Sequence, residues 1–151
     1  MLELATLSDR EAVNTMAREV HAMHVSWRPD IYRMPEELYP EDRFLEAISE
    51  GQLYVAKIDG TVAGYVLVRV RAVENPGLVP RKIMLVDELC VEEAFRRQGV
   101  GTGMMREIRA LAQALGCTDL QLGVYPQNAD AVAFYRKCGF NMQSVTMQRK
   151  V

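Results

Sequence analysis

The sequence predicts an α/β (α+β) fold in which helices flank one mixed, mostly antiparallel sheet. Two strand-like segments, residues 53–58 and 61–70, are joined by an Asp-Gly dipeptide, which is typical of a tight antiparallel hairpin. Residues 83–86 are apolar at every position, which predicts a strand covered on both faces in the interior of the sheet. A glycine-rich turn, a helix and a strand at 120–125 follow, in the order of a parallel crossover.

Length and composition indicate one ordinary globular domain covering residues 1–151. Charged residues make up 25% and hydrophobic residues 49% of the chain, which excludes a disordered composition. The formal charge of −2 gives no general attraction to nucleic acid or to a membrane surface. The N-terminus has no basic segment before an apolar core, and no apolar run has the length of a membrane span. We therefore expect a cytoplasmic protein with neither nucleic acid nor membrane as a partner.

The first part of the chain contains a short strand and two predicted helices. After a strand at residues 2–5, apolar residues at helical spacing predict a helix to about residue 26. Residues 27–35 contain two prolines and three large side chains, so they form a loop that covers the core or walls a functional site. Residues 40–49 form the second helix, with proline and acids in its first turn.

The last part of the chain predicts two more helices and one more strand. The helix that follows the glycine-rich turn ends at Gly116, and its apolar residues define an inner face. A further helix at residues 129–137 ends at Gly139, which we expect in the left-handed conformation of a Schellman stop. Residues 141–149 are predicted to form the final strand of the sheet.

The turn Arg96-Arg97-Gln98-Gly99-Val100-Gly101 predicts an anion-binding site. Its glycines let main-chain N–H groups approach a ligand closely, and the helix that begins there adds unpaired N–H groups and a positive dipole end. The two arginines and the glutamine add donors that suit a pyrophosphate. A Walker loop is excluded by spacing, and a dinucleotide fingerprint would need glycine where Met104 stands. That fingerprint and a turn without any ligand remain the alternatives.

Two motifs resemble the GNAT superfamily of N-acetyltransferases. The Arg/Gln-x-x-Gly-x-Gly turn is similar to the coenzyme A loop of that family. The stretch from Asn128 to Phe140 is similar to its Asn-x-x-Ala…Phe-Tyr-x-x-x-Gly-Phe helix, and the order of elements agrees over essentially the whole chain. The first eighty residues match in layout more than in motif.

The resemblance implies a GNAT-like sheet whose two parallel strands splay apart, with the pantetheine arm of acetyl-CoA in the gap. It implies acetyl-CoA as cosubstrate, no metal, and a small-molecule or peptide amine as acceptor. Dimers are common in the family, so a homodimer is a further expectation. The residues that it assigns to acetyl-CoA are Leu89, Cys90 and Val91 for the pantetheine, Arg96, Arg97, Gln98, Gly99, Val100, Gly101 and Thr102 for the pyrophosphate, and Asn128 for the arm.

Acetyl transfer by direct attack needs a base for the amine and an acid for the departing thiolate. Tyr135 suits the acid, because a phenol with a pKa of about 10 stays protonated at neutral pH and can donate to a thiolate; the family uses the matching tyrosine in this way. Asp87 and Glu88 are the candidates for the base. Neighbours on a strand point to opposite faces, so only one is expected to face the cleft unless a bulge breaks the alternation. Glu88 is the preferred base.

Other functions remain open at this stage. A coenzyme A-binding sensor or interaction module without turnover is one alternative, and a nucleotide-dependent oxidoreductase is another. His21 and His24 could form a metal pair, but two imidazoles alone are weak evidence, and His24 could instead line an acceptor pocket beside Trp27 and Tyr32. Cys90 could be a nucleophile, although direct transfer needs no covalent intermediate. The three cysteines are otherwise expected to be reduced and buried.

Overall fold

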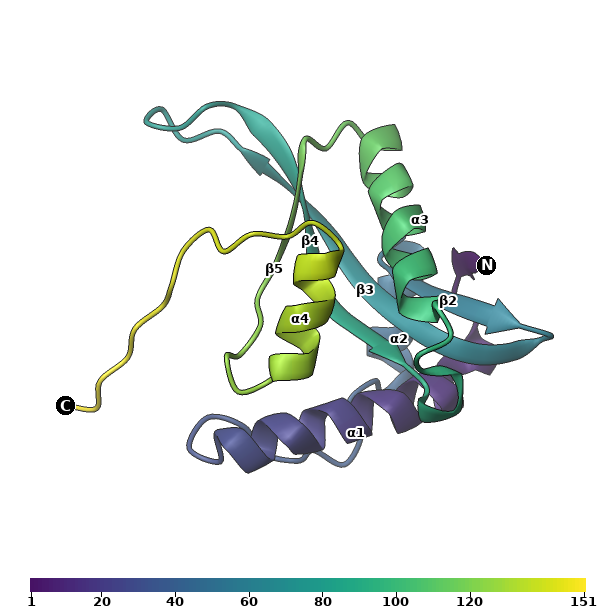
Figure 1. The fold of residues 1–151 in the computed structure, drawn as a ribbon. Helices are drawn as coiled ribbons and strands as arrows, with labels where there is room; N and C mark the ends of the chain where they lie inside the picture. The colour runs from purple at the N-terminus through teal and green to yellow at the C-terminus, as the bar shows by residue number, and fades with distance from the viewer.

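The computed structural model describes residues 1–151 and contains one five-stranded sheet with helices on both faces (Figure 1). The strands lie in chain order and are β1 (Leu2–Leu4), β2 (Leu53–Ile58), β3 (Thr61–Val73), β4 (Arg81–Val91) and β5 (Asp119–Leu122). Neighbouring strands are antiparallel except for β4 and β5, which are parallel. The predicted mixed, mostly antiparallel sheet is confirmed.

Four α-helices cover the sheet: α1 (Arg10–Trp27), α2 (Glu41–Ser49), α3 (Val100–Ala114) and α4 (Ala129–Lys137). Residues of α1 and α2 pack on one face of the sheet, whereas residues of α3 and α4 pack on the other. Short 3-10 turns precede α1 and α3. None of these helices combines the length and the apolar character that crossing a membrane requires.

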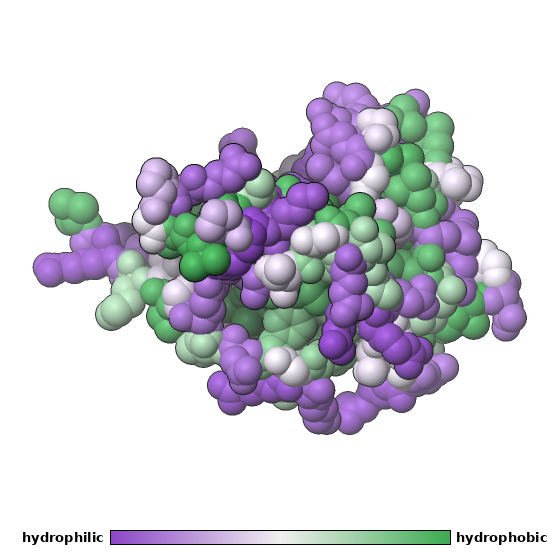
Figure 2. Space-filling view, turned by 90° about the horizontal axis from the view of Figure 1, so that it is seen from above, coloured by the Kyte–Doolittle hydropathy of each residue, from purple (hydrophilic) through white to green (hydrophobic).

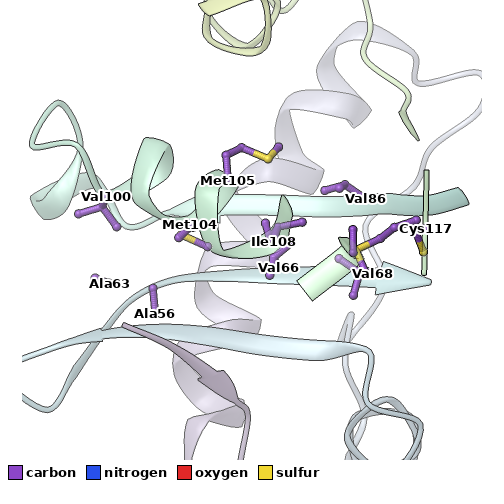
Figure 3. Packing of buried hydrophobic residues seen from close by; sticks show 12 residues of the cluster. Ala56, Ala63, Val66, Val68, Val86, Val100, Met104, Met105, Ile108 and Cys117 are labelled. Atoms are coloured by element: carbon purple, nitrogen blue, oxygen red, sulfur yellow. The ribbon is translucent and has the colours of Figure 1, made fainter. Parts of the chain in front are cut away.

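The core on the α3 face is formed by one apolar side of that helix and by small and branched residues of the strands (Figure 3). Met104 and Ile108 are completely buried against Val66 and its neighbours. Small side chains at Ala56 and elsewhere on the strands let the helix come close. This close contact fixes the start of α3, where the glycine-rich turn lies, relative to β4.

The core on the other face joins α1 and α2 to the opposite side of β2, β3 and β4. Its largest buried side chains include Met16 of α1, Phe44 of α2, and the two tyrosines Tyr39 and Tyr65. Tyr39 lies between α1 and α2 in the chain but is only 1% exposed. The loop after α1 is therefore anchored in the core at its C-terminal end.

The hairpin of β2 and β3 turns at Asp59 and Gly60, as predicted. Their φ angles of 49° and 77° are both positive, as a type I′ turn requires. The next hairpin is longer than predicted, because β3 runs to Val73 and β4 starts at Arg81. Its tip projects beyond the body of the molecule (Figure 1).

A β-bulge interrupts β4 at Asp87. Glu88 pairs with Leu67 of β3, and Val86 pairs with the next residue, Val68, so Asp87 has no partner on β3. The extra residue reverses the alternation of the strand. Before the bulge Met84 and Val86 face α3, and after it Leu89 and Val91 contact the same core.

The predicted final strand is wrong. Residues 141–151 form neither strand nor helix, and all of them are exposed. The helix α4 does end as expected, because Gly139 has a φ of 92° and the N–H of Phe140 donates to the Tyr135 carbonyl at 3.0 Å. Beyond Phe140 the chain extends away from the sheet (Figure 1).

Candidate functional site

The parallel strands β4 and β5 are paired over only part of their length. Ile83 to Val86 pair with Asp119 to Leu122, where β5 ends, whereas β4 continues to Val91. The edge of β4 at residues 87–91 that faces β5 therefore has no strand partner. An extended ligand could form main-chain hydrogen bonds along this edge.

The glycine turn, residues 96–103, connects this edge to α3. Arg97 and Gly99 both have positive φ angles, 61° and 82°. Main-chain hydrogen bonding of the helical type starts at Gly103, whose N–H donates to the Gly99 carbonyl at 2.9 Å. The six main-chain N–H groups of residues 97–102 donate to no protein group. They and the positive end of the α3 dipole offer a site for an anion.

Two of the three polar side chains of this turn hold its main chain in shape and do not point to the anion site. Arg96 donates from Nε to the Val91 carbonyl at 2.8 Å, and Gln98 donates from Nε2 to the Ala94 carbonyl at 2.9 Å. Arg97 forms no ion pair and no side-chain hydrogen bond within the protein. Of the three polar side chains expected to meet an anion, Arg97 is therefore the one that is free.

Helix α4 packs against the glycine turn. A Cβ atom at Gly101 would lie 3.2 Å from the edge of the Phe134 ring, which is closer than ordinary van der Waals contact. Asn128 occupies the N-cap of α4, where its Oδ1 accepts from the Ala131 N–H at 3.2 Å. Its Nδ2 has no partner in the protein and remains available to a ligand.

Tyr135 lies on α4 between two other aromatic rings, those of Phe134 and Phe140, with centroids at 5.3 and 5.8 Å. Burial raises the pKa of its hydroxyl above the ordinary value, so the phenol stays protonated at neutral pH. No protein group hydrogen-bonds to this hydroxyl. Every polar side-chain atom that is fully buried in this protein has a hydrogen-bond partner. The Tyr135 hydroxyl has no partner, so it is not fully buried and is accessible to solvent.

Glu88 is held by two tyrosines. The hydroxyls of Tyr39 and Tyr65 both donate to its Oε2 at 2.8 Å. Burial, followed by the negative charge of Glu88, raises the pKa of both tyrosines, which keeps them as donors. The second carboxylate oxygen, Oε1, has no protein partner. Sequence reasoning missed both tyrosines, because nothing local in the chain links positions 39 and 65 to position 88.

Asp87 and Glu88 line one pocket, so the expectation that they face opposite sides of the sheet is wrong. The bulge at Asp87 turns both side chains toward a pocket of about 400 Å³ between α2, β3 and β4. Asp87 is not free there, because both of its oxygens accept from the Arg69 guanidinium. Of the two carboxylates, only Glu88 thus has an oxygen, Oε1, without a hydrogen-bond partner in the protein.

An aromatic cluster joins the loop after α1 to the segment between β5 and α4. His24 lies within 5.2 to 5.6 Å of the rings of Trp27, Tyr32 and Tyr125. The hydroxyls of Tyr32 and Tyr125 are 3.0 Å apart, and this hydrogen bond, with burial, raises the pKa of Tyr32 to about 12. The expected neighbours His24, Trp27 and Tyr32 are brought together, and Tyr125 is an addition that the sequence did not indicate.

The alternative roles for histidine and cysteine receive no support from the geometry. His21 donates from Nε2 to the Arg33 carbonyl, and His24 donates from Nδ1 to the Val20 carbonyl. No group of three or more metal-binding side chains is found. Cys90 is 5% exposed, and burial raises the pKa of its thiol to about 11, which disfavours the reactive thiolate.

Comparison with known proteins points to one family. The model of the acetyltransferase (GNAT) family matches residues 20–140. An N-alpha-acetyltransferase from Sulfolobus acidocaldarius is 32% identical, covering 97% of this chain and 81% of its own. An L-amino acid N-acetyltransferase from Escherichia coli is 28% identical, covering 92% of this chain and 81% of its own.

Solved structures agree with the fold. A mutant protein from Bacillus halodurans superposes with a TM-score of 0.94 at 28% identity, over 100% of this chain and 99% of its own. An aminoglycoside N-acetyltransferase in complex with CoA has a TM-score of 0.67 at 15% identity, over 100% of this chain and 99% of its own, and this likeness concerns the fold alone.

Proposed function

Because the chain belongs to the acetyltransferase (GNAT) family, we propose that it transfers the acetyl group of acetyl-CoA to a primary amine by direct attack in a ternary complex. The observation that carries this proposal is the set of six unbonded N–H groups at residues 97–102, next to the open edge of β4. The names of the relatives support an amine acceptor of the amino-acid or peptide class.

Acetyl-CoA would bind along two connected surfaces. The N–H groups of residues 97–102 and the free Arg97 side chain suit its pyrophosphate. The main chain of residues 89–91 suits the amide groups of its pantetheine arm, and the Nδ2 of Asn128 can donate to the same arm. The side chains of Arg96 and Gln98 contribute by holding the turn.

Two side chains would handle the protons. The amine nitrogen attacks the thioester carbonyl carbon and gives up its proton to Glu88, directly or through water. The carbon–sulfur bond then breaks, and the Tyr135 hydroxyl gives its proton to the departing thiolate. Glu88 belongs with the residues of the α1 and α2 face, and Tyr135 packs against the core of the α3 face. In this proposal the acid and the base therefore act from opposite faces of the sheet.

Release of free thiol from acetyl-CoA, measured with a panel of amines, tests the proposal. We expect turnover with at least one amine, and a loss of kcat of about 10²- to 10⁴-fold in Tyr135→Phe and in Glu88→Gln, as for general acid–base groups. Tyr54→Phe is the matched control, because the Tyr54 hydroxyl forms no hydrogen bond in the protein, and it should keep full activity. Wild-type kcat in Tyr135→Phe would remove that residue from its role.

Thermal unfolding in the presence of acetyl-CoA tests the binding of acetyl-CoA separately from the transfer of its acetyl group. A stabilised protein that turns over no amine would be a coenzyme A-binding module, whereas a protein without stabilisation would not bind acetyl-CoA. NAD should give no stabilisation in the same measurement.

A further inference from the structure

The carboxylate of Glu88 has buried tyrosine hydroxyls as its partners. Hydrophilic side chains make up much of the outer surface in Figure 2, where water can solvate their charges. The Oε2 atom of Glu88 instead accepts from the hydroxyls of Tyr39 and Tyr65, each at 2.8 Å. Both tyrosines are only 1% exposed. Donors held in this way are pointed at the charge by the fold itself, so they need no reorganisation during a reaction.

The packing of the rings fixes the direction of the two hydroxyls. The rings of Tyr39 and Tyr65 meet edge to face, with centroids 6.2 Å apart. The Tyr39 ring meets that of Phe44 in the same way, also at 6.2 Å. Tyr65 belongs to β3, the central strand, which is paired on both sides. Neither hydroxyl can therefore turn away from Glu88 without disturbing the core of this face.

Asn14 of α1 holds Tyr39 in place. Its Oδ1 accepts from the Tyr39 N–H at 2.9 Å, and its Nδ2 donates to the Tyr39 carbonyl at 3.0 Å. One side chain thus bonds both main-chain groups of a residue that is 25 positions away in the chain. The contacts form a continuous series from Asn14 on α1 through Tyr39 to Glu88 on β4, and from there to Tyr65 on β3.

Two donors on one oxygen have two consequences for a carboxylate that acts as a base. They favour its charged form, which is the form that can accept a proton. They also occupy Oε2, so that Oε1 of Glu88, which has no protein partner, is the atom that can take the proton. Burial, followed by the charge of Glu88, raises the pKa of Tyr39 and Tyr65, so their own protons stay in place.

We propose that Tyr39 and Tyr65 are positioning residues for Glu88, and that Asn14 acts one step further away by fixing Tyr39. This inference rests on the proposed function, in which Glu88 accepts the proton of the attacking amine. As the nitrogen–carbon bond forms, the proton moves from the amine nitrogen to Oε1 of Glu88. Neither tyrosine gains or loses a proton, and each acts through the carboxylate that it holds.

Other charged and titratable groups face Glu88 from β3, β4 and α2, but none of them donates a hydrogen bond to it. Helix α1 packs on the same face with uncharged residues, Val13, Met16 and Ala17. The titration of Glu88 should therefore respond most directly to its two tyrosines. The groups in question are Arg69 of β3, Asp87 and Cys90 of β4, and Arg43, Glu46 and Glu50 of α2.

Titration of the Glu88 carboxyl group tests the proposal without any turnover. The group is followed by ¹³C NMR in protein labelled at the glutamate carboxyl carbons, and its signal is the one that is absent in Glu88→Gln. The midpoint should lie about one pH unit higher in Tyr39→Phe and in Tyr65→Phe than in the wild type, which corresponds to about 1.4 kcal/mol. Asn14→Ala should move the midpoint in the same direction by a smaller amount.

An unchanged midpoint in both tyrosine variants overturns the proposal, whether or not the protein turns over an amine. An unchanged midpoint in Asn14→Ala overturns the part assigned to Asn14. Ile108→Val is the control for lost stability, because Ile108 is completely buried in the core of the other face. It should lower the thermal midpoint and leave the Glu88 titration as in the wild type. A shift in this control equal to that of the tyrosine variants would contradict a specific role of the hydroxyls.

Kinetics in two backgrounds separate positioning from a general loss of structure. In the wild-type background, Tyr65→Phe should lower kcat about tenfold. The KM for acetyl-CoA should stay unchanged, because the anion site lies at the start of α3, on the other face. In the Glu88→Gln background the same change should cause no further loss, since the group that it positions is already gone.

An equal loss of kcat in both backgrounds would mean that Tyr65 acts on the fold and not through Glu88. Tyr54→Phe removes a hydroxyl that forms no hydrogen bond, so it should change neither kcat nor the titration. A wild-type protein that turns over no amine refutes the proposed function, and the NMR titration then still decides whether the tyrosines hold Glu88 in its charged form.

Discussion

At the scale of single residues, the two neighbouring carboxylates of β4 differ in what surrounds them. Asp87 shares both oxygens with the Arg69 guanidinium, so its charge is already matched. Glu88 accepts two hydroxyl donors on one oxygen and keeps the other oxygen free. This difference is the reason why Glu88 and not Asp87 is the proposed base, and it depends on two tyrosines.

Removing either tyrosine hydroxyl should therefore destabilise the fold. Tyr65→Phe and Tyr39→Phe should each lower the free energy of unfolding by about 1.5 to 3 kcal/mol, the range for hydrogen bonds to a charged group. Because both donors share one oxygen, the double variant should depart from the sum of the single effects. Urea unfolding measures these values, with Tyr54→Phe as the unaffected control. Two variants as stable as the wild type would show that Glu88 does not need these donors.

The same tyrosines predict how stability depends on pH. Burial and the nearby Glu88 raise the pKa of Tyr39 and Tyr65 above the ordinary value of 10.0 in the folded protein. In the unfolded chain these phenols lose their protons near pH 10, so above it the unfolded state binds fewer protons than the folded state. The free energy of unfolding should be fully retained below pH 10 and should fall as the pH rises further. Urea unfolding on both sides of pH 10 should give a shallower decline in the Tyr39→Phe/Tyr65→Phe variant, and an equal slope would contradict the assignment.

At the scale of elements, the glycine turn and α4 form one unit. The Phe134 ring lies against Gly101 in the first turn of α3, and Asn128 caps the helix that carries both Phe134 and Tyr135. A change in the turn should therefore affect both the anion site and the helix of the candidate acid.

Gly101→Ala tests this contact. The new Cβ would lie 3.2 Å from Phe134 and 3.5 Å from Val91, so the turn or the ring must shift by a few tenths of an ångström. The Kd for acetyl-CoA, measured by calorimetry, should rise about tenfold, or about 1.4 kcal/mol. Gly123→Ala is the matched control, because a Cβ there meets no atom within 4 Å. Equal affinity in the two variants would mean that the turn does not need this close approach.

The elements themselves were largely predictable, because their signals are local. The Asp59-Gly60 turn, the helix stop at Gly139 and the start of α3 each depend on a few adjacent residues. The bulge at Asp87 has no such signal, since it arises from the register of β3 against β4 over the whole hairpin. For the same reason the sequence could propose Asp87 and Glu88 but could not tell which way each side chain points.

At the scale of the whole molecule, the site is assembled from residues far apart in the chain. Glu88 meets Tyr39 from the loop before α2 and Tyr65 from β3, and Tyr32 meets Tyr125 across the site. No spacing rule links these positions, so sequence reasoning found the residues of the two motifs and missed their partners. The prediction of a final strand was wrong for a related reason. Residues 141–149 have a sequence compatible with a strand, but no strand of the same chain pairs with them.

The loop between α1 and α2 is clamped at its second end by an exchange of hydrogen bonds. The Tyr39 N–H donates to Asn14 Oδ1 at 2.9 Å, and Asn14 Nδ2 donates back to the Tyr39 carbonyl at 3.0 Å. Residues 28–38 are thus a loop whose two ends are held in place, by α1 at one end and by Tyr39 at the other. Changes of sequence within residues 29–37 should therefore leave the Glu88 carboxylate in place, because the contacts that hold Tyr39 come from Asn14 and not from this loop.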